Sequence, residues 1–580
     1  MLNPQRRHLV DGSHWVSPVD FEAGVTAEFA FPKPLRVIDS TLRKTLFTAG
    51  HTTSRLGFQR IAEALVELGV EDESINVTWT GSAHPAPQDW ALLEAVVEGG
   101  FPFRLNVYTD TLLSNGCDRH RVSMRQTVDQ LADAGVRIAA PGILEAPDDA
   151  AQARQVEELE EYFSYAGAAG LDTTITLAQV GRRDFGRMVT MARHAVRLGA
   201  RRLDLMDSTS SLHPEAMKVF VRRFRDAVGP DVPVTMHVHD EFGLATAGAI
   251  AAATAGAHPD VAMNGMSYRC GFAPLEEVVL ALETLYGVDT GLRLDRIQQV
   301  ARVVERESGI TLPALKPLTG RYAYLKNMPG DVAAAITQGQ DAFPPISHGL
   351  VPSALGQKLT WVWGGLSSEG MVRALAENEG VPVTDDEVLV LRRAMDAIVA
   401  AIPSYPRWLT AAEATARFHE LLARLRVPRD PEFLRAALTA ANPHEPWIET
   451  VLVKAAPESA SVIQTAWDAV SVAEDVEAML AFCNPLGEPV TDDSARSRFS
   501  AAEESGVAGD EVAALAREYE DRMGFRFVLA TAGLGTEDVL ARLHTRLWAA
   551  PARERETARR ELRTIVDNRL IDQLTRGNET

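Results

Sequence analysis

Apolar runs and amphipathic stretches alternate regularly along the first half of the chain. Amphipathic stretches such as FQRIAEALVEL at 58–68 predict helices, and the short apolar runs between them predict buried strands. Glycine recurs about every 30 residues where these helices should end, the usual place for a left-handed cap. These glycines are Gly69, Gly100, Gly135, Gly170, Gly199, Gly229, Gly256 and Gly287.

Eight strand-like runs can be placed on this repeat. They begin with LRVIDS at 35–40 and continue as ESINVTW, FRLNVY, VRIAAP, DTTITLA, RRLDLM, VPVTMHVH and DVAMNG. Eight strands that are each followed by a helix predict an α/β protein with a (β/α)8 TIM barrel over 31–300. A doubly wound open sheet has the same alternation, but eight units without an early Gly-x-Gly-x-x-Gly loop favour the barrel.

The rest of the chain predicts other kinds of structure. Residues 1–30 form an N-terminal extension, and 301–427 has a mainly helical pattern, predicted as a linker or lid subdomain. Its Pro- and Gly-rich stretch at 338–357 predicts a loop or a cover. From 428 to 580 the pattern is amphipathic and helical again, which predicts a separate all-α domain.

Composition narrows the class of protein. A net charge of −21 disfavours nucleic acid as a partner, because phosphate binding requires a basic surface. No run approaches the length of a membrane span, and the N-terminus lacks the apolar core of a signal peptide. The three cysteines, at 117, 270 and 483, suggest neither a disulfide framework nor a zinc cluster. We therefore expect a cytoplasmic protein with small-molecule partners.

The chemistry of a TIM barrel lies at the carboxyl ends of its strands. Polar residues of this chain fall there. They are Asp39 and Arg43 after the first strand, Asp207 after the sixth, His237 and His239 at the end of the seventh, and Asn264 after the eighth. We expect Asp39, Asp207 and Asn264 to bind substrate.

Three collinear motifs carry a family resemblance. IDSTLRKTLFTAGHTTSRLGFQRIAEALVELGV (38–70), MHVHDEFGLATAGAIAAATAGA (236–257) and MNGMSYRCGFAPLEEVVLALETLYGVDTG (263–291) resemble the DRE-TIM metallolyases, which include isopropylmalate, homocitrate and citramalate synthases and hydroxymethylglutaryl-CoA lyases. The resemblance covers about 30–300 and continues more weakly to about 425.

The resemblance implies a site and a chemistry. A divalent metal would be bound by an acidic residue directly after Arg43, by His237 and His239, and by an asparagine after the eighth strand. The metal would hold a 2-oxo acid, Arg43 would steady the developing oxyanion, and an acyl-CoA would be the second substrate. The family also implies a homodimer.

This chain departs from that ligand set at two positions. Lys44 stands where the family has Asp or Glu, and Phe272, in RCGF, stands where it has Asn. Carboxylates supply most of the charge compensation for a hard cation, and two unit positive charges about 4 Å apart repel by ~4 kcal/mol at an effective dielectric of about 20. We therefore expect an ordinary metal site to be weak or absent.

Several roles remain open for these residues. The histidines bind a metal, act as acid and base, or are structural. Lys44 stabilises an oxyanion in place of the metal, forms a Schiff base, or forms a salt bridge with Asp39, Asp207 or Glu241. Other family positions also differ. The strand-5 acidic pair falls on Ala178 and Gln179, the strand-2 glutamate on Asn76, and 322–330 has no histidine, so leucine biosynthesis itself is not implied.

The C-terminal region carries a second resemblance. DPEFLRAALTAANPHEPWIETV, NPLGE, SAAEESG and YEDRMGFRFVLATAGLGTEDVLARLHTRL, with ELRTIVDNRLIDQL, resemble the cofactor-free 2-oxo-4-hydroxy-4-carboxy-5-ureidoimidazoline decarboxylases. That family's glutamate and arginine carry over as Glu503 and Arg569, and its catalytic histidine is replaced by Asn484. Since an amide does not titrate near neutral pH, a different substrate is expected.

Three functional hypotheses follow. The first is a bifunctional enzyme that makes or breaks a carbon–carbon bond next to the carbonyl of a 2-oxo acid, by Claisen or aldol chemistry, and then decarboxylates or holds the product. The second gives catalysis to one domain and a scaffold role to the other. The third is a non-catalytic assembly protein derived from two enzymes. Retention of Arg43, the histidine pair, Glu503 and Arg569 favours the first hypothesis, in a specialised pathway.

Overall fold

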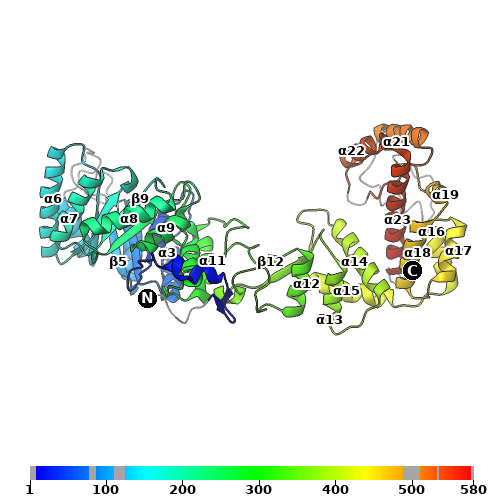
Figure 1. Ribbon diagram of the computed structural model, residues 1–580, viewed down its shortest axis with the longest axis horizontal. Coiled ribbons are helices and arrows are strands. Elements are labelled where there is room, and N and C mark those ends of the chain that lie inside the picture. The colour runs from blue at the N-terminus through cyan, green and yellow to red at the C-terminus, as the bar shows by residue number, and fades with distance from the viewer. Residues whose placement is uncertain (1–7, 78–85, 110–123, 487–509, 532–533, 576–580) are drawn as a thin grey trace. The chain divides into compact units, whose positions relative to one another are not determined.

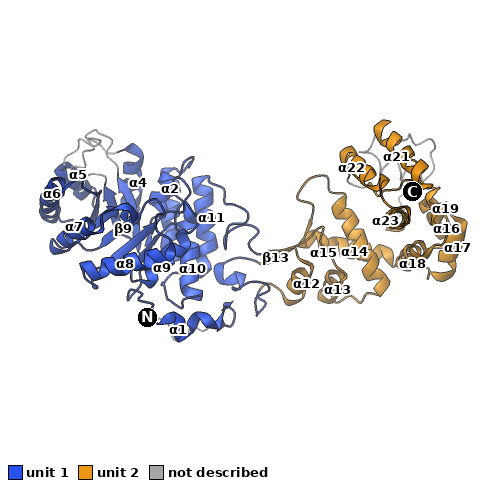
Figure 2. Ribbon diagram, turned by 45° about the horizontal axis from the view of Figure 1, so that its top comes forward, with its two compact units in different colours: residues 1–324, 341–358 blue, residues 325–340, 359–580 orange. Residues whose placement is uncertain are grey.

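The structure is a computed structural model that describes residues 8–77, 86–109, 124–486, 510–531 and 534–575. The chain divides into two compact units, shown in Figure 2. Unit 1 contains residues 1–324 and 341–358, and unit 2 contains residues 325–340 and 359–580. Each unit has its own apolar core. The segment 301–427, expected as one subdomain, is thus divided between the two units.

Unit 1 is built on a closed barrel of parallel strands (Figure 1). The strand order is β5-β4-β3-β11-β10-β9-β8-β6-β7, and pairing of β5 with β6 closes the ring. The predicted TIM barrel is confirmed, with the fifth strand run interrupted into β7 and β8. The strands are β3 (Ile38–Asp39), β4 (Asp72–Val77), β5 (Arg104–Thr109), β6 (Ile138–Ile143), β7 (Asp172–Thr173), β8 (Ile175–Ala178), β9 (Leu203–Asp207), β10 (Val234–Val238) and β11 (His258–Val261).

Helices surround this barrel. All eight glycines of the sequence repeat have positive φ, from 62° at Gly100 to 115° at Gly229, as expected where a helix ends and the chain turns into a strand. The helices are α2 (Thr41–Phe47), α3 (Arg55–Leu68), α4 (Pro87–Glu98), α5 (Met124–Asp133), α6 (Asp149–Ala168), α7 (Phe185–Arg197), α8 (Pro214–Val228), α9 (Ala245–Thr254), α10 (Leu275–Thr284) and α11 (Ile297–Ser308). The chain before the barrel contains β1 (Leu9–Val10), β2 (His14–Trp15) and α1 (Ala23–Thr26).

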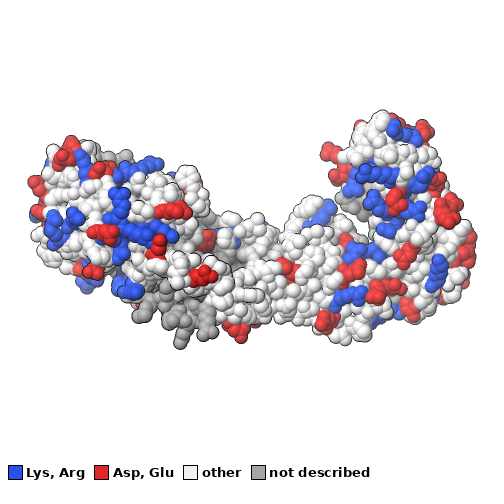
Figure 3. Space-filling model, in the orientation of Figure 1, with Lys and Arg blue, Asp and Glu red and all other residues white. Residues whose placement is uncertain are grey.

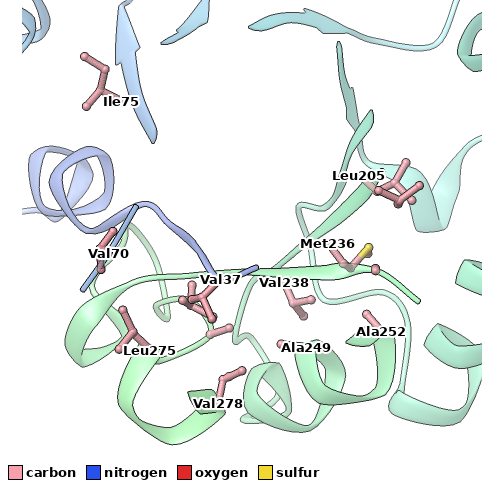
Figure 4. Close-up of a cluster of buried hydrophobic side chains, with 14 of the residues drawn as sticks. Val37, Val70, Ile75, Leu205, Met236, Val238, Ala249, Ala252, Leu275 and Val278 are labelled. Carbon is pink, nitrogen blue, oxygen red and sulfur yellow. The ribbon is translucent and has the colours of Figure 1, made fainter. Parts of the chain in front are cut away.

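The two faces of β10 have different surroundings. Met236 and Val238 lie on the outer face, near Ala249 and Ala252 of α9, in the apolar layer between barrel and helices (Figure 4). Successive side chains of a strand point to opposite faces, so Thr235 and His237 point into the barrel. Inside, the Thr235 hydroxyl donates to Asp204 at 2.6 Å. This period of two brings the polar residues of β10 to the barrel axis.

Unit 2 contains a small sheet and a set of packed helices. Its sheet joins β12 (Leu325–Lys326), β13 (Thr360–Trp363) and β14 (Leu409–Thr410). The described part of 428–580 is helical, as predicted. The helices are α12 (Pro329–Gln338), α13 (Glu369–Asn378), α14 (Asp385–Ala400), α15 (Ala411–Leu425), α16 (Pro431–Ala441), α17 (Glu445–Lys454), α18 (Ser459–Val472), α19 (Val476–Leu480), α21 (Asp510–Met523), α22 (Thr536–Leu547) and α23 (Pro551–Thr575).

A buried arginine ties the first helices of unit 2 to the C-terminal ones. Arg393 of α14 donates from Nε to Asp567 of α23 at 2.9 Å, and its guanidinium lies 4.3 Å from the ring centroid of Trp467 on α18. Because breaking a buried ion pair leaves an uncompensated charge, this contact couples the two parts. Residues 359–427 therefore share a core with the C-terminal helices.

The surface carries charges of both signs. Figure 3 shows Lys and Arg interspersed with Asp and Glu on the visible face of each unit, with Lys and Arg gathered over α8 in unit 1. No helix in the described part of the chain combines the length and the apolar character that a bilayer crossing needs.

Candidate active site at the barrel mouth

The helix α2 places two cationic residues at the mouth of the barrel. It begins directly after β3, and the Lys44 backbone N–H donates to the Ser40 carbonyl at 2.8 Å, so the first turn is tied to the strand end. The side chains of Arg43 and Lys44 are 8% and 1% exposed. Both residues predicted to act on the substrate therefore lie inside the barrel mouth.

The two histidines are held by their Nδ1 atoms. His237 Nδ1 lies 2.6 Å from Oδ2 of Asp260, and His239 Nδ1 lies 3.1 Å from the Gly271 carbonyl oxygen. A carbonyl or carboxylate oxygen accepts, so each Nδ1 carries the proton and each Nε2 presents a lone pair. The two Nε2 atoms lie 3.4 Å apart. The site thus presents two unprotonated ring nitrogens to one small region.

Lys44 fills the region that these nitrogens face. Its Nζ lies 3.0 Å from His237 Nε2 and 4.6 and 5.5 Å from the ring centroids of Phe272 and Tyr268. Burial, reinforced by the neighbouring Arg43 charge, holds the pKa of Lys44 well below its usual range. The expected alternative for Lys44, a salt bridge with Asp39, Asp207 or Glu241, is not what the structure shows; its polar contact is with His237.

The same surroundings keep the imidazoles neutral. Burial and the Lys44 charge lower the pKa of His237 well below its usual value. Burial and the adjacent His237 and Lys44 lower the pKa of His239 to about 2. At physiological pH both rings are therefore neutral, and each Nε2 is available as a hydrogen-bond acceptor.

Arg43 lies beside Lys44 and the two histidines, and some of its hydrogen-bond donors are unused. Its guanidinium carbon is 4.1 Å from the ring centroid of Tyr108, whose hydroxyl donates to Asp204 at 3.0 Å. The Nε and Nη1 atoms of Arg43 are buried and have no hydrogen-bond partner in the protein. A guanidinium binds carboxylates through two parallel N–H bonds, so a carboxylate next to Lys44 would satisfy both atoms.

A pair of buried carboxyl groups lies at the base of α2. Asp39 accepts from the Thr41 backbone N–H at 2.8 Å and from its hydroxyl at 2.9 Å. Burial raises the pKa of Asp39 to about 6, and burial together with Asp39 raises the pKa of Glu73 well above its usual value. Parallel register of β3 and β4 pairs Asp39 directly with Glu73, so two buried carboxyl groups are strand neighbours. Asp39 thereby orients α2; its predicted contact with substrate stays a prediction.

The residues at the mouth do not fit the divalent metal that the family resemblance implies. The position that should hold a carboxylate holds the Lys44 amine, and the Phe272 ring covers His237 at a centroid distance of 4.0 Å. Two neutral imidazoles beside Lys44 and Arg43 offer no negative charge to balance a hard cation. In the described ranges no set of three or more His, Cys, Asp and Glu side chains has the arrangement of a metal site.

Two further predicted residues are engaged in local structure. Asp207 accepts from the backbone N–H groups of Ser211 and Leu212, at 2.8 and 2.9 Å. Asn264 has a φ of 63° and donates from Nδ2 to the Ala301 carbonyl at 2.9 Å. Both side chains hold turns at the barrel mouth, and their role in substrate binding stays a prediction.

The candidate residues of the C-terminal domain are only partly described. Arg569 on α23 is 4% exposed and donates from Nη1 to the Ala441 carbonyl at 3.2 Å. Asn484 is half-buried in the turn after α19. Glu503 lies outside the described residues. The second predicted site is therefore represented by a buried arginine and an amide on separate elements of unit 2.

Three residues of the barrel mouth were not predicted from the sequence as site residues. Asp260 orients His237, Glu73 pairs with Asp39, and Tyr268 lies 5.0 Å from His239 between ring centroids. Asp260 had a signal: it is a carboxylate inside an apolar strand, and parallel register pairs it directly with His237. Glu73 had the same kind of signal, since it lies in a strand-like run and register pairs it with Asp39, whereas Tyr268 lies in a loop and had no comparable signal.

Comparisons with known proteins match two different families to the barrel region and to the C-terminal helical region. Residues 34–304 match the family model described as HMGL-like, and residues 429–571 match the model described as OHCU decarboxylase. A protein of Methanopyrus kandleri named "Putative (R)-citramalate synthase" is 30% identical over 374 residues, which cover 62% of this chain and 68% of the relative. A homocitrate synthase of Saccharolobus solfataricus is 27% identical over 417 residues, 70% of this chain and 84% of the relative.

Part of this chain also aligns with solved structures. A hydroxymethylglutaryl-CoA lyase from Pseudomonas aeruginosa aligns with 48% of this chain and 93% of its own, with 17% sequence identity and a TM-score of 0.38.

Proposed function

Since this chain belongs to the HMGL-like family of citramalate and homocitrate synthase relatives and carries an OHCU decarboxylase domain, we propose that it is a bifunctional carbon–carbon bond enzyme. The barrel makes or breaks a bond next to the carbonyl of a small 2-oxo acid, with an acyl-CoA or another carbonyl compound as second substrate. The helical domain decarboxylates or holds a carboxylate product in a specialised pathway.

One observation carries this proposal. Lys44 Nζ lies 3.0 Å from His237 Nε2, in the region where the family would place its metal. The amine and Arg43 supply the positive charge that activates a carbonyl, and a donor directed at a developing oxyanion contributes about 3–4 kcal/mol to catalysis. The free donors of Arg43 hold the substrate carboxylate. His239, with an unprotonated Nε2, accepts the proton of the carbon that becomes the nucleophile.

The test measures 2-oxo acid consumption by the full chain after chelator treatment. Purified protein is incubated with pyruvate, 2-oxobutyrate or 2-oxoglutarate, each with and without acetyl-CoA, and bound metals are determined by elemental analysis. Activity should survive chelation, and Lys44→Met should lower turnover by ~100-fold or more. Lys218→Met, on α8 and away from the mouth, is the matched control. Activity that requires a stoichiometric divalent ion, or survives Lys44→Met, contradicts the proposal.

A further inference from the structure

The environment of Lys44 supports a more specific role than electrostatic stabilisation. Its amine faces a ring nitrogen whose lone pair is fixed, because His237 Nδ1 is bound to Asp260 at 2.6 Å. A lysine that attacks a carbonyl must first lose a proton, and His237 Nε2, 3.0 Å from Nζ, is placed to accept it. The Phe272 and Tyr268 rings lie beside the amine, and Lys44 is buried.

We propose that Lys44 forms a covalent imine with the 2-oxo acid and that the barrel is an aldolase-type enzyme. This inference rests on the proposed function of the same site and names its intermediate and its second substrate. The substrate carboxylate would lie on the free Nε and Nη1 donors of Arg43, the residue adjacent to Lys44. That placement brings the neighbouring carbonyl carbon to the amine.

The first half of the reaction is a condensation. Lys44 Nζ gives a proton to His237 Nε2 and forms a bond to the carbonyl carbon. The carbonyl oxygen takes protons from the histidine and from the nitrogen and leaves as water, which gives a protonated imine. His239 Nε2 then removes a proton from C3, and the electron pair of that C–H bond moves to form an enamine.

The second half forms the carbon–carbon bond. C3 of the enamine attacks the carbonyl carbon of an aldehyde or ketone, whose oxygen takes the proton held by His239. Water then adds to the imine carbon, the C–N bond breaks, and Lys44 is released with the 2-oxo acid product. No oxidant, reductant or metal is needed to balance these steps.

An imine at Lys44 is compatible with an aldol reaction and not with a Claisen condensation. In a Claisen condensation the 2-oxo acid is the electrophile, and attack on its imine carbon would leave a C–N single bond that hydrolysis does not cleave. In an aldol reaction the same imine makes the 2-oxo acid the nucleophile and is hydrolysed afterwards. The second substrate is therefore a carbonyl compound, and an acyl-CoA is not required.

The experiment is reductive trapping on the full chain. Protein is incubated with pyruvate, 2-oxobutyrate or 2-oxoglutarate and reduced with borohydride, and the modified peptide is identified by mass spectrometry. Pyruvate should add the mass of one pyruvate less one oxygen atom, on Lys44. Lactate, which has no carbonyl, should give no adduct. Lys218→Arg should be trapped like the native protein, whereas Lys44→Arg should not be trapped.

A second readout does not depend on reduction. In D2O the enamine should exchange the C3 protons of the bound 2-oxo acid without a second substrate, and Lys44→Arg should abolish this exchange as followed by NMR. Absence of both adduct and exchange with all three acids, or an adduct on another lysine, overturns the imine. If turnover is nevertheless chelator-resistant and dependent on Lys44, the proposed function stands and only the covalent step fails.

Discussion

The contact between His237 and Asp260 gives the sharpest prediction for the barrel. Asp260 is fully buried, accepts the Ser40 hydroxyl at 2.7 Å, and lies 2.6 Å from His237 Nδ1. Asp260→Asn keeps the shape of the side chain and removes its charge. The amide can donate to Nδ1, which moves the ring proton to Nε2 and removes the acceptor that faces Lys44.

The size of the effect follows from the bond that is lost. A hydrogen bond to a charged group contributes about 1.5–3 kcal/mol, and about 1.4 kcal/mol corresponds to tenfold in rate. Asp260→Asn should therefore lower kcat/KM for the 2-oxo acid by roughly 10- to 100-fold. Borohydride trapping of Lys44 should slow by a similar factor, because the amine loses its proton acceptor.

The assay compares steady-state consumption of 2-oxo acid, the rate of trapping, and thermal unfolding. Ser40→Ala is the matched control, since it removes the other hydrogen bond to Asp260 but leaves the charge and the His237 contact. It should reduce kcat/KM far less than Asp260→Asn. Equal losses in the two variants, or an Asp260→Asn enzyme with native turnover and trapping, would refute the tautomer argument.

Three other predictions test different parts of the molecule. Combining Lys44→Glu with Phe272→Asn restores the family's ligand types beside the two histidines, so isothermal titration should detect one Mn²⁺ or Zn²⁺ site that the native protein lacks; equal affinity in both contradicts the poor metal fit. Burial raises the pKa of Asp39 in the folded protein to about 6, above its ordinary 3.8, so the unfolded chain loses this proton first and the free energy of unfolding falls as pH rises from 3.8 to about 6. Denaturant unfolding at several pH values should show a shallower decline of this free energy for Asp39→Asn. The same pH dependence in both proteins would show that Asp39 does not titrate there. Arg569→Ala should abolish carbon dioxide release from the product while barrel turnover persists; loss of both activities, or of neither, rejects a separate carboxylate site.

The order of elements was readable from the chain. Apolar runs at a regular interval specify the barrel. Each helix-ending glycine, such as Gly69 or Gly229, has a positive φ, which glycine adopts without steric strain because it has no Cβ atom. The type of residue at the mouth was readable too, because Arg43, Lys44 and the histidine pair follow strand ends. These inferences depend on local sequence, where the period of the pattern decides the structure.

The side-chain contacts inside the barrel depend on the tertiary structure. Asp260 lies beside His237 because parallel register aligns β10 with β11, and Glu73 reaches Asp39 because β4 is the neighbour of β3. No local pattern encodes these pairings, since a helical segment separates the two partners along the chain in each case. The sequence by itself determined a barrel with a cation in place of a ligand carboxylate. Closure of the barrel fixed the tautomers of the two histidines and placed the Lys44 amine next to an unprotonated imidazole nitrogen. Burial makes these contacts specific, because it removes the water that would otherwise solvate each group independently.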